Sequence, residues 1–269
     1  MLLYHIIILA IVQGLTEFLP VSSSGHLVLT HYLLGNSNSD LCWTQNRLMD
    51  VAVHVGTLLS VLFYFYKDIM LMIGGVFKPQ SEGFGLSKNI IIASLPVIIA
   101  GFIIQQFQFS FLCLLQTMAW MTLIFGIVLW WADKYQTGRN LIEMRTAHAF
   151  IIGLSQILAL IPGVSRSGIT MTSARFLGFS RVEAAKFSLL LSIIAISGAG
   201  VLSSYDLLQT QSLSLGQDVI IAVILSFIAG WISIWAMMKW LAHASFKPFA
   251  VYRIILGVAL LGLTYSGIL

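Results

Sequence analysis

The chain has 269 residues, of which 58% are hydrophobic and only 9% are charged. Soluble domains carry about 25% charged residues, so this composition excludes a water-soluble globular protein. The formal net charge of +4 would suggest a nucleic-acid partner for a soluble protein. In a membrane protein the same excess arises because Lys and Arg collect in cytoplasmic loops. We therefore expect a multi-pass membrane protein that binds no nucleic acid.

The first predicted element, His5–Leu19, is apolar but too short to cross a membrane as a straight helix. At 1.5 Å per residue its ~15 residues cover ~22 Å of a hydrocarbon core about 30 Å thick. The run stops at Pro20 and leads into the polar turn Val21–His26, Val-Ser-Ser-Ser-Gly-His. This pattern predicts a re-entrant hairpin, which survives at membrane depth only when it is buried in protein or lines a wet cavity.

We assign three crossings to the apolar runs that come next: Leu48–Tyr66, Ile90–Ile104 and Phe111–Ala132. A second short arm, Ala147–Ile161, stops at Pro162 and leads into the turn Gly163–Gly168. We assign three further crossings to the runs Phe187–Val201, Val219–Met238 and Phe249–Leu269. We therefore predict an all-α fold with about six full spans and two re-entrant hairpins, in a single membrane domain covering residues 1–269.

The loops between these runs predict the orientation. Basic residues occur in three of them: Lys67, Lys78 and Lys88; Lys134, Arg139 and Arg145; Lys239 and Lys247. The segments Gln105–Ser110 and Ser203–Asp218 contain neither Lys nor Arg. With the basic loops in the cytoplasm, every crossing alternates and the chain ends outside.

The two hairpins also match one another at an offset of 143 residues. The identical pairs are Gln13 and Gln156, Leu15 and Leu158, Val21 and Val164, Ser22 and Ser165, Ser24 and Ser167, Gly25 and Gly168, Leu34 and Leu177, and Gly35 and Gly178. Each half, 1–135 and 144–269, then consists of a hairpin followed by three spans. Because three crossings reverse the direction of insertion, we predict an inverted repeat whose broken segments meet near the middle of the membrane.

Two carboxylates are candidate metal ligands. Glu17 lies one turn before the first break, where an ionised carboxylate costs ~2.5–3.5 kcal/mol unless it faces a partner or a cavity. It could instead cap the following turn or stay protonated. Gln13 shares its helical face. Asp50, at the start of the first full crossing, could join Glu17 around Mg²⁺ or Ca²⁺, or could instead cap its helix.

The second turn has the character of a phosphate site. Ser165-Arg166-Ser167-Gly168 follows Pro-Gly and opens a new helical arm, whose free amides and hydroxyls can hold an anion. Arg166 can grip a phosphate in two places, and Thr170 lies one turn further on. The alternative is an arginine that extends toward the membrane surface, beside serines that cap backbone groups. It does not explain well why Arg166 lies deep in the hairpin.

The first turn adds Ser22, Ser23, Ser24 and His26. Serines in membrane hairpins more often cap backbone groups than attack substrates. His26 could move a proton for a serine or a water, or could simply bond a helix carbonyl. Together the two turns offer a carboxylate, hydroxyls, an imidazole, a guanidinium and amides, which is what phosphoryl transfer needs.

Two segments, Gln13–His26 and Pro162–Thr170, resemble the signature motifs of the bacterial undecaprenyl-diphosphatase family, the bacitracin-resistance phosphatases. The resemblance extends over essentially the whole chain. It implies hydrolysis of undecaprenyl diphosphate to the monophosphate at the outer face of the cytoplasmic membrane, which recycles the lipid carrier for peptidoglycan. It also implies a requirement for a divalent cation.

Carried over by position, the family's acidic motif falls on Gln13 and Glu17, so only Glu17 supplies charge. His54 stands where a glutamine-like residue is expected. The catalytic residues we predict are Glu17, Ser23, His26 and Arg166, with either Ser23 or a water as nucleophile. The predicted phosphate-binding residues are Ser22, Ser24, Ser165, Arg166, Ser167, Gly168 and Thr170. The predicted metal ligands are Glu17, Gln13 and Asp50.

A transporter or flippase of a polyprenyl phosphate is the rival hypothesis, because paired broken segments in an inverted repeat are typical of alternating access. The expected partners are the lipid substrate and membrane lipid, and the sequence leaves a homodimer open.

Overall fold

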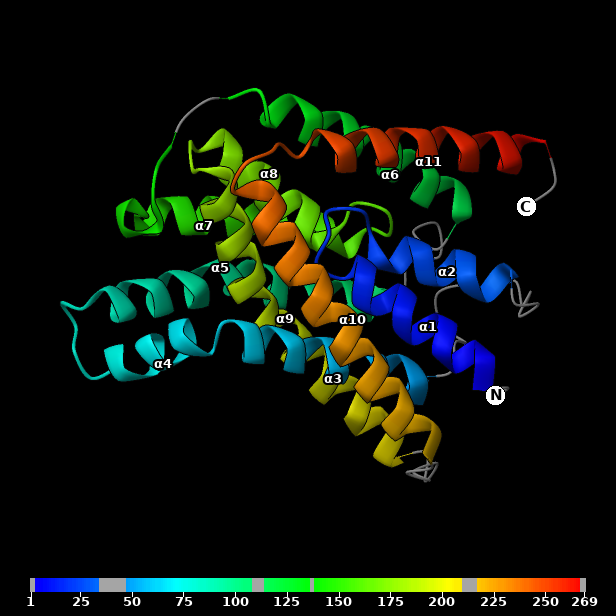
Figure 1. Cartoon of the computed structure of the whole chain (residues 1–269), viewed down its shortest axis with the longest axis horizontal. Coiled ribbons are helices and arrows are strands. Elements are labelled where there is room, and N and C mark those ends of the chain that lie inside the picture. The colour runs from blue at the N-terminus through cyan, green and yellow to red at the C-terminus, as the bar shows by residue number, and fades with distance from the viewer. Residues whose placement is uncertain (1–2, 34–46, 108–113, 136–137, 210–216, 267–269) are drawn as a thin grey trace.

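The computed structural model describes residues 3–33, 47–107, 114–135, 138–209 and 217–266 (Figure 1). Regular structure in these ranges is helical, apart from one isolated bridge between Arg139 and Phe179. The helices are α1 (Leu3–Thr16), α2 (Ser23–Leu33), α3 (Arg47–Tyr64), α4 (Tyr66–Gly75), α5 (Glu82–Phe107), α6 (Leu115–Ala132), η2 (Leu141–Glu143), α7 (Thr146–Gln156), η3 (Ile157–Leu160), α8 (Arg166–Phe176), α9 (Arg181–Gln209), α10 (Gln217–Leu241) and α11 (Lys247–Tyr265). The prediction of an all-α fold is confirmed.

Several helices are suited to a membrane. In the described residues, α5, α6, α10 and α11 are long and apolar enough to cross one, and α3 with α4 adds a fifth span if that bent pair counts as one. Their outward side chains are large and apolar, as at Phe102 and Ile255, which suits a surface in contact with lipid. The chain is thus a multi-pass membrane protein. The predicted run Phe187–Val201 lies within α9, and the count of six spans stays a prediction.

The first predicted crossing, Leu48–Tyr66, is not one straight helix. α3 and α4 meet at the buried Phe65 with a bend of 76°. α4 then carries Asp68, whose carboxylate lies 2.6 Å from Lys186 Nζ on α9. The apolar run therefore continues into a second helix, which packs against α5 and forms one ion pair with α9. Sequence analysis had treated those residues as a loop.

Both predicted hairpins are helix–turn–helix units, and their re-entry into a membrane stays a prediction. The first arm of each ends near its proline, α1 at Thr16 and α7 with η3 at Leu160. The second arms, α2 and α8, begin after the polar turns. The identities predicted at Leu34 and Gly35 lie outside the described residues.

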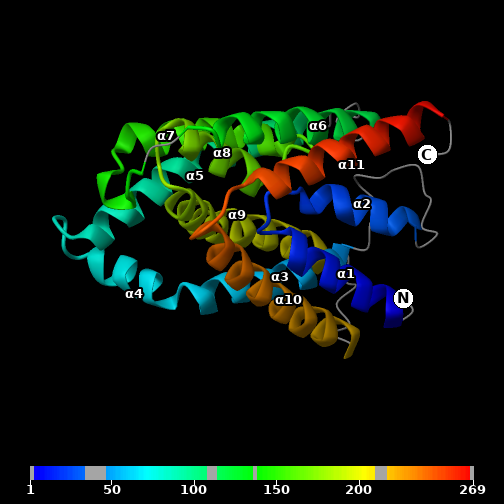
Figure 2. The same cartoon turned by 45° about the horizontal axis from the view of Figure 1, so that its top comes forward.

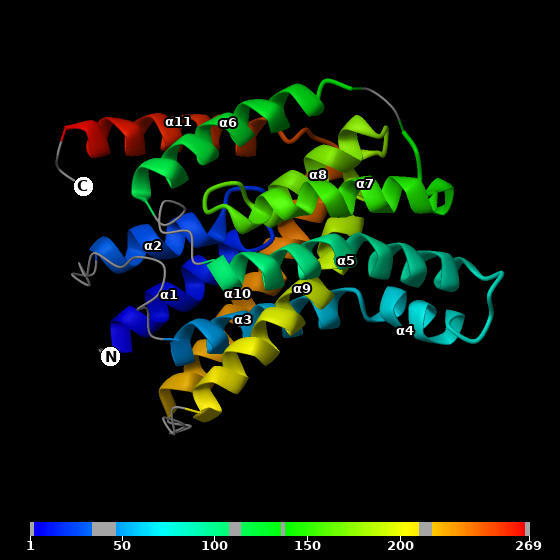
Figure 3. The same ribbon diagram turned by 180° about the vertical axis from the view of Figure 1, so that it is seen from behind.

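Helices of one half pack against helices of the other half (Figures 1 and 2). α1 of the first hairpin lies against α10, and α7 of the second lies against α5. In the same way α3 contacts α10, and α9 contacts α5. α6 and α11 lie side by side along one face in every view, including the view from behind in Figure 3. The first arm of each hairpin thus packs on the other half. The inverted repeat and its boundaries stay a prediction.

Candidate active site

The two polar turns are built alike. Ser22 and Ser165, which are equivalent at the offset of 143, have φ of 74° and 70° and are the two non-glycine residues with positive φ in the described ranges. In each turn this serine's hydroxyl lies close to the hydroxyl two residues on, 3.3 Å for Ser22 to Ser24 and 3.2 Å for Ser165 to Ser167. Left-handed backbone at a serine is strained, and its presence at both equivalent positions marks one local structure used twice.

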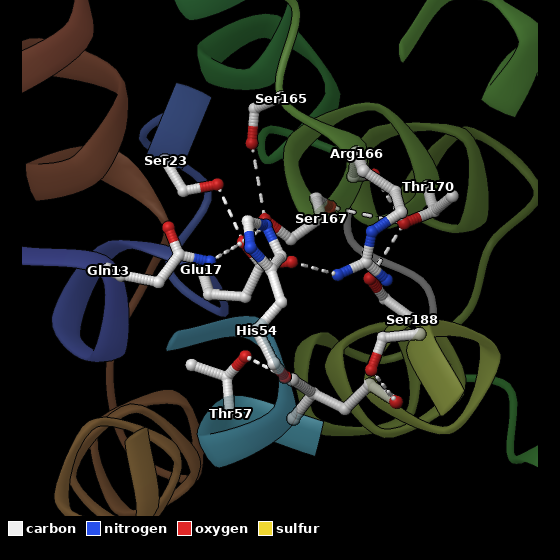
Figure 4. Close-up of polar contacts among 12 residues, drawn as sticks. Gln13, Glu17, Ser23, His54, Thr57, Ser165, Arg166, Ser167, Thr170 and Ser188 are labelled. Carbon is white, nitrogen blue, oxygen red and sulfur yellow. Dashed lines mark hydrogen bonds and ion pairs between the residues drawn. The ribbon is translucent and has the colours of Figure 1, made fainter. Parts of the chain in front are cut away.

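Glu17 is the point at which the two hairpins meet (Figure 4). Its Oε1 accepts a hydrogen bond from Arg166 Nη2 at 2.8 Å. Its Oε2 accepts one from Ser23 Oγ at 2.7 Å and another from Gln13 Nε2 at 2.8 Å. Ser23 and Arg166 are themselves equivalent at the offset of 143. Side chains at equivalent positions of the two turns therefore donate hydrogen bonds to the two oxygens of the Glu17 carboxylate. The predicted acid, Glu17, and the predicted guanidinium, Arg166, are in direct contact.

This ion pair is largely shielded from solvent. The Glu17 side chain is 7% exposed and that of Arg166 is 17% exposed. Removing two charges from water costs several kcal/mol per ion unless hydrogen bonds compensate, and here the carboxylate has three donors. Arg166 is also the first residue of α8, where the opening amides of a helix have no intrahelical acceptor. The guanidinium and these amides form a positive region suited to phosphate.

Most of the other predicted phosphate ligands bond within the protein. Ser165 Oγ accepts from Gly168 N at 3.1 Å and so caps α8. Ser167 Oγ donates to the carbonyl of Leu19 in the first turn at 2.9 Å. Thr170 Oγ1 lies 2.7 Å from the hydroxyl of Ser188 on α9 (Figure 4). These side chains fix the turn and join it to its neighbours, which agrees with the capping interpretation of the serines.

The contacts of His26 are with Ser22 and Tyr252 and not with the Glu17 carboxylate. Its Nδ1 lies 2.7 Å from the carbonyl oxygen of Ser22, and its Nε2 lies 2.5 Å from the hydroxyl of Tyr252 on α11. The two rings stack, with centroids 5.7 Å apart. His26 therefore bonds a helix carbonyl, as the alternative interpretation held, and Tyr252 engages its second nitrogen.

His54 is the imidazole beside the carboxylate, and sequence analysis drew nothing from it. Its Nε2 lies 4.0 Å from Glu17 Oε2, and its Nδ1 lies 2.6 Å from the backbone carbonyl of Asp50 (Figure 4). Its side chain is 34% exposed. The available signal was its place one turn after Asp50 on a predicted spanning helix, but sequence alone cannot show which hairpin that helix faces.

The Asp50 carboxylate lies beside His31 and not beside the Glu17 carboxylate. Its carboxylate lies 3.8 Å from Nε2 of the buried His31. Groups of three or more His, Cys, Asp or Glu side chains that could hold a metal do not occur in the described part of the chain. Gln13 Oε1 is buried without a hydrogen-bond partner, while Nε2 of the same amide donates to Glu17 Oε2. One carboxylate and one amide oxygen fit a cation such as Mg²⁺ that takes its other ligands from phosphate and water.

Comparison with known proteins gives one consistent result. The family model described as bacitracin resistance protein BacA matches residues 6–259. The undecaprenyl-diphosphatase of Roseobacter denitrificans is 42% identical over 278 residues, covering 99% of this chain and 100% of the relative. The undecaprenyl-diphosphatase of Ruegeria pomeroyi is 40% identical with the same coverage, and undecaprenyl-diphosphatase 1 of Rhodospirillum rubrum is 41% identical over 99% of this chain and 97% of its own length.

Proposed function

The chain belongs to the bacitracin resistance protein BacA family, and from this membership we propose that it hydrolyses undecaprenyl diphosphate to undecaprenyl phosphate and inorganic phosphate. The observation that carries the proposal is the contact of Glu17 with both Ser23 and Arg166. These contacts bring together a base (Glu17), a hydroxyl (Ser23) and a guanidinium that can bind phosphate (Arg166). They connect the two turns on which the family resemblance rests.

The Arg166 guanidinium and the first amides of α8 bind the terminal phosphate. Arginine can contact two phosphate oxygens at once and stays charged at every physiological pH. These donors stabilise the charge that builds on the phosphoryl oxygens during transfer. Arg166 also pairs with Glu17, so the substrate shares an arginine that is already held in place.

Ser23 is the better candidate for the nucleophile, because its hydroxyl already donates to a carboxylate. A nucleophile in hydrogen-bond contact with its base is the expected arrangement for covalent catalysis. Ser23 Oγ forms a bond to the terminal phosphorus while the bond from that phosphorus to the bridging oxygen breaks. The serine proton passes to Glu17, and undecaprenyl phosphate leaves. Water then hydrolyses the phosphoserine and releases inorganic phosphate.

A divalent cation belongs to this proposal. Glu17 and Gln13 Oε1 would hold it together with oxygens of the diphosphate. Once bound, such an ion neutralises phosphate charge and orients the leaving group.

We place the protein in the cytoplasmic membrane with its site open to the outer face. The orientation that keeps the basic loops inside supports this side. Undecaprenyl phosphate released there is the lipid carrier needed again for wall polymers, and its recycling would confer resistance to bacitracin.

Purified protein in detergent is expected to release inorganic phosphate from a polyprenyl diphosphate in the presence of Mg²⁺, and excess EDTA is expected to stop the release. A colorimetric phosphate assay measures both. Restored release on adding Mg²⁺ after EDTA is the control for damage by the chelator. Movement of a labelled polyprenyl phosphate between the leaflets of vesicles, with no phosphate released, would instead support the transporter.

His54→Gln is expected to lower kcat by about 10²-fold, the usual contribution of a positioned proton carrier. The reason is that Nδ1 bonds the carbonyl of Asp50, which leaves Nε2 facing Glu17 Oε2 and able to accept its proton.

Steady-state phosphate release measures this loss of kcat, with the exposed His243→Gln as the control. His26→Gln is measured in parallel. If His26→Gln lowers kcat by about 10²-fold and His54→Gln leaves it unchanged, the proton carrier is His26, as the sequence first suggested.

A further inference from the structure

Arg253 is the largest fully buried side chain among the residues described, and the reaction above does not use it. It lies on α11 with 0% of its side chain exposed. In the sequence it is the one charged residue of the last predicted span, Phe249–Leu269. A buried charge needs compensation, so the surroundings of this guanidinium indicate its role.

Its contacts are with the phosphate-binding turn. Nη2 donates to the backbone carbonyls of Gly163 and Val164, at 2.8 Å in each case. A Cβ atom added at Gly168 would lie 2.6 Å from Nη1 and 3.1 Å from Ser165 Oγ. The guanidinium therefore lies directly against the turn, and it can approach because residue 168 has no side chain.

Its charge has no carboxylate partner in the described residues. The ion pairs there use Glu17, Asp50, Asp68 and Asp133 with other cations. Nε and Nη1 of Arg253 are buried without hydrogen-bond partners. Glu17 and Arg166 neutralise one another, so Arg253 leaves the two turns together with one net positive charge in a region shielded from water.

We propose that Arg253 is a positioning residue that orients the Pro162–Gly168 turn and supplies the charge that favours a diphosphate over a monophosphate. This inference rests on the proposed function. By holding the carbonyls of Gly163 and Val164 on one side of the turn, Arg253 keeps the first amides of α8 and the Arg166 side chain toward the substrate. Its own charge acts through the turn and not by contact. A diphosphate carries more negative charge than a monophosphate and gains more from an unscreened cation in a low-dielectric region.

Inorganic pyrophosphate and inorganic phosphate are the probes, and the rise in melting temperature of the detergent-solubilised protein measures their binding. Arg253→Gln keeps a donor for the turn carbonyls but removes the charge. It is expected to weaken pyrophosphate binding at least about tenfold, because a charge shielded from water interacts strongly with an anion several ångströms away. Phosphate binding should change less. Arg253→Lys keeps the charge and should retain most of the pyrophosphate shift.

Arg175→Gln is the matched control. Arg175 is also a buried arginine that bonds backbone carbonyls, those of Phe179 and Tyr135, but it lies at the far end of α8. The Arg175→Gln variant should have a lower melting temperature, but pyrophosphate should raise that temperature by as much as in the wild type. On polyprenyl diphosphate, Arg253→Gln should raise KM more than it lowers kcat, and Arg253→Lys should restore KM.

Two results would overturn the inference: a wild-type pyrophosphate shift in Arg253→Gln, or a lost shift in a folded Arg253→Lys. The result for Arg253→Lys tests the inference even if Arg253→Gln does not fold. If wild-type protein shows no pyrophosphate shift and releases no phosphate, the proposed function itself fails. A wild-type shift that Arg253→Gln leaves unchanged defeats only the role of Arg253.

Discussion

Arg166→Ala is expected to lower kcat/KM for polyprenyl diphosphate by about 10²–10³-fold, the usual effect of removing one preorganised donor for a developing anion. The variant loses the guanidinium that binds phosphate. It also leaves Glu17, which is 7% exposed, with only the neutral donors Ser23 and Gln13. Steady-state phosphate release in detergent measures the loss.

Arg166→Lys separates charge from shape. A lysine keeps one positive charge but cannot contact two phosphate oxygens in one plane, so we expect it to recover only a small part of the activity. Arg145→Ala, at the exposed start of α7, is the control for removing an arginine from the same half of the protein. Wild-type phosphate release by folded Arg166→Ala would contradict the assignment of Arg166.

The hairpins were predictable because their signals are local. A proline followed by a run of small polar residues ends an apolar arm that is too short to cross, and both features are visible in sequence at Pro20 and Pro162. The repeat offset aligned Ser22 with Ser165, and these residues share a positive φ in the structure. The same offset paired Ser23 with Arg166, but only the fold shows that both contact one carboxylate.

The remaining features depend on contacts between distant segments. His54 faces Glu17 because α3 packs against both α1 and α10, and no local pattern encodes that packing. Asp50 was paired with Glu17 on chemical grounds alone, whereas its carboxylate lies beside His31. The bend at Phe65 has no proline or glycine to announce it, so a continuous apolar run was taken for one crossing.

Glu17→Gln is expected to reduce kcat by about 10³-fold, within the range that general acid–base catalysis contributes. The change preserves shape but removes the charge that attracts a cation and the group that accepts the proton of Ser23. It also places two N–H donors where Arg166, Ser23 and Gln13 all donate. At least one donor must then lose its acceptor, which destabilises the site as well as slowing the reaction. The melting temperature and phosphate release are both measured, with the exposed Glu143→Gln as the control.

The double variant Glu17→Gln with Arg166→Ala tests whether the two residues act as one unit. Residues that act together give losses that do not add, because the second change removes an interaction that the first has already broken. We therefore expect the double variant to be little slower than Glu17→Gln alone. Its melting temperature should recover part of the loss, since neither charge is left buried without its partner. Fully additive losses in both kcat and stability would mean that the 2.8 Å contact between the two side chains has no part in the reaction.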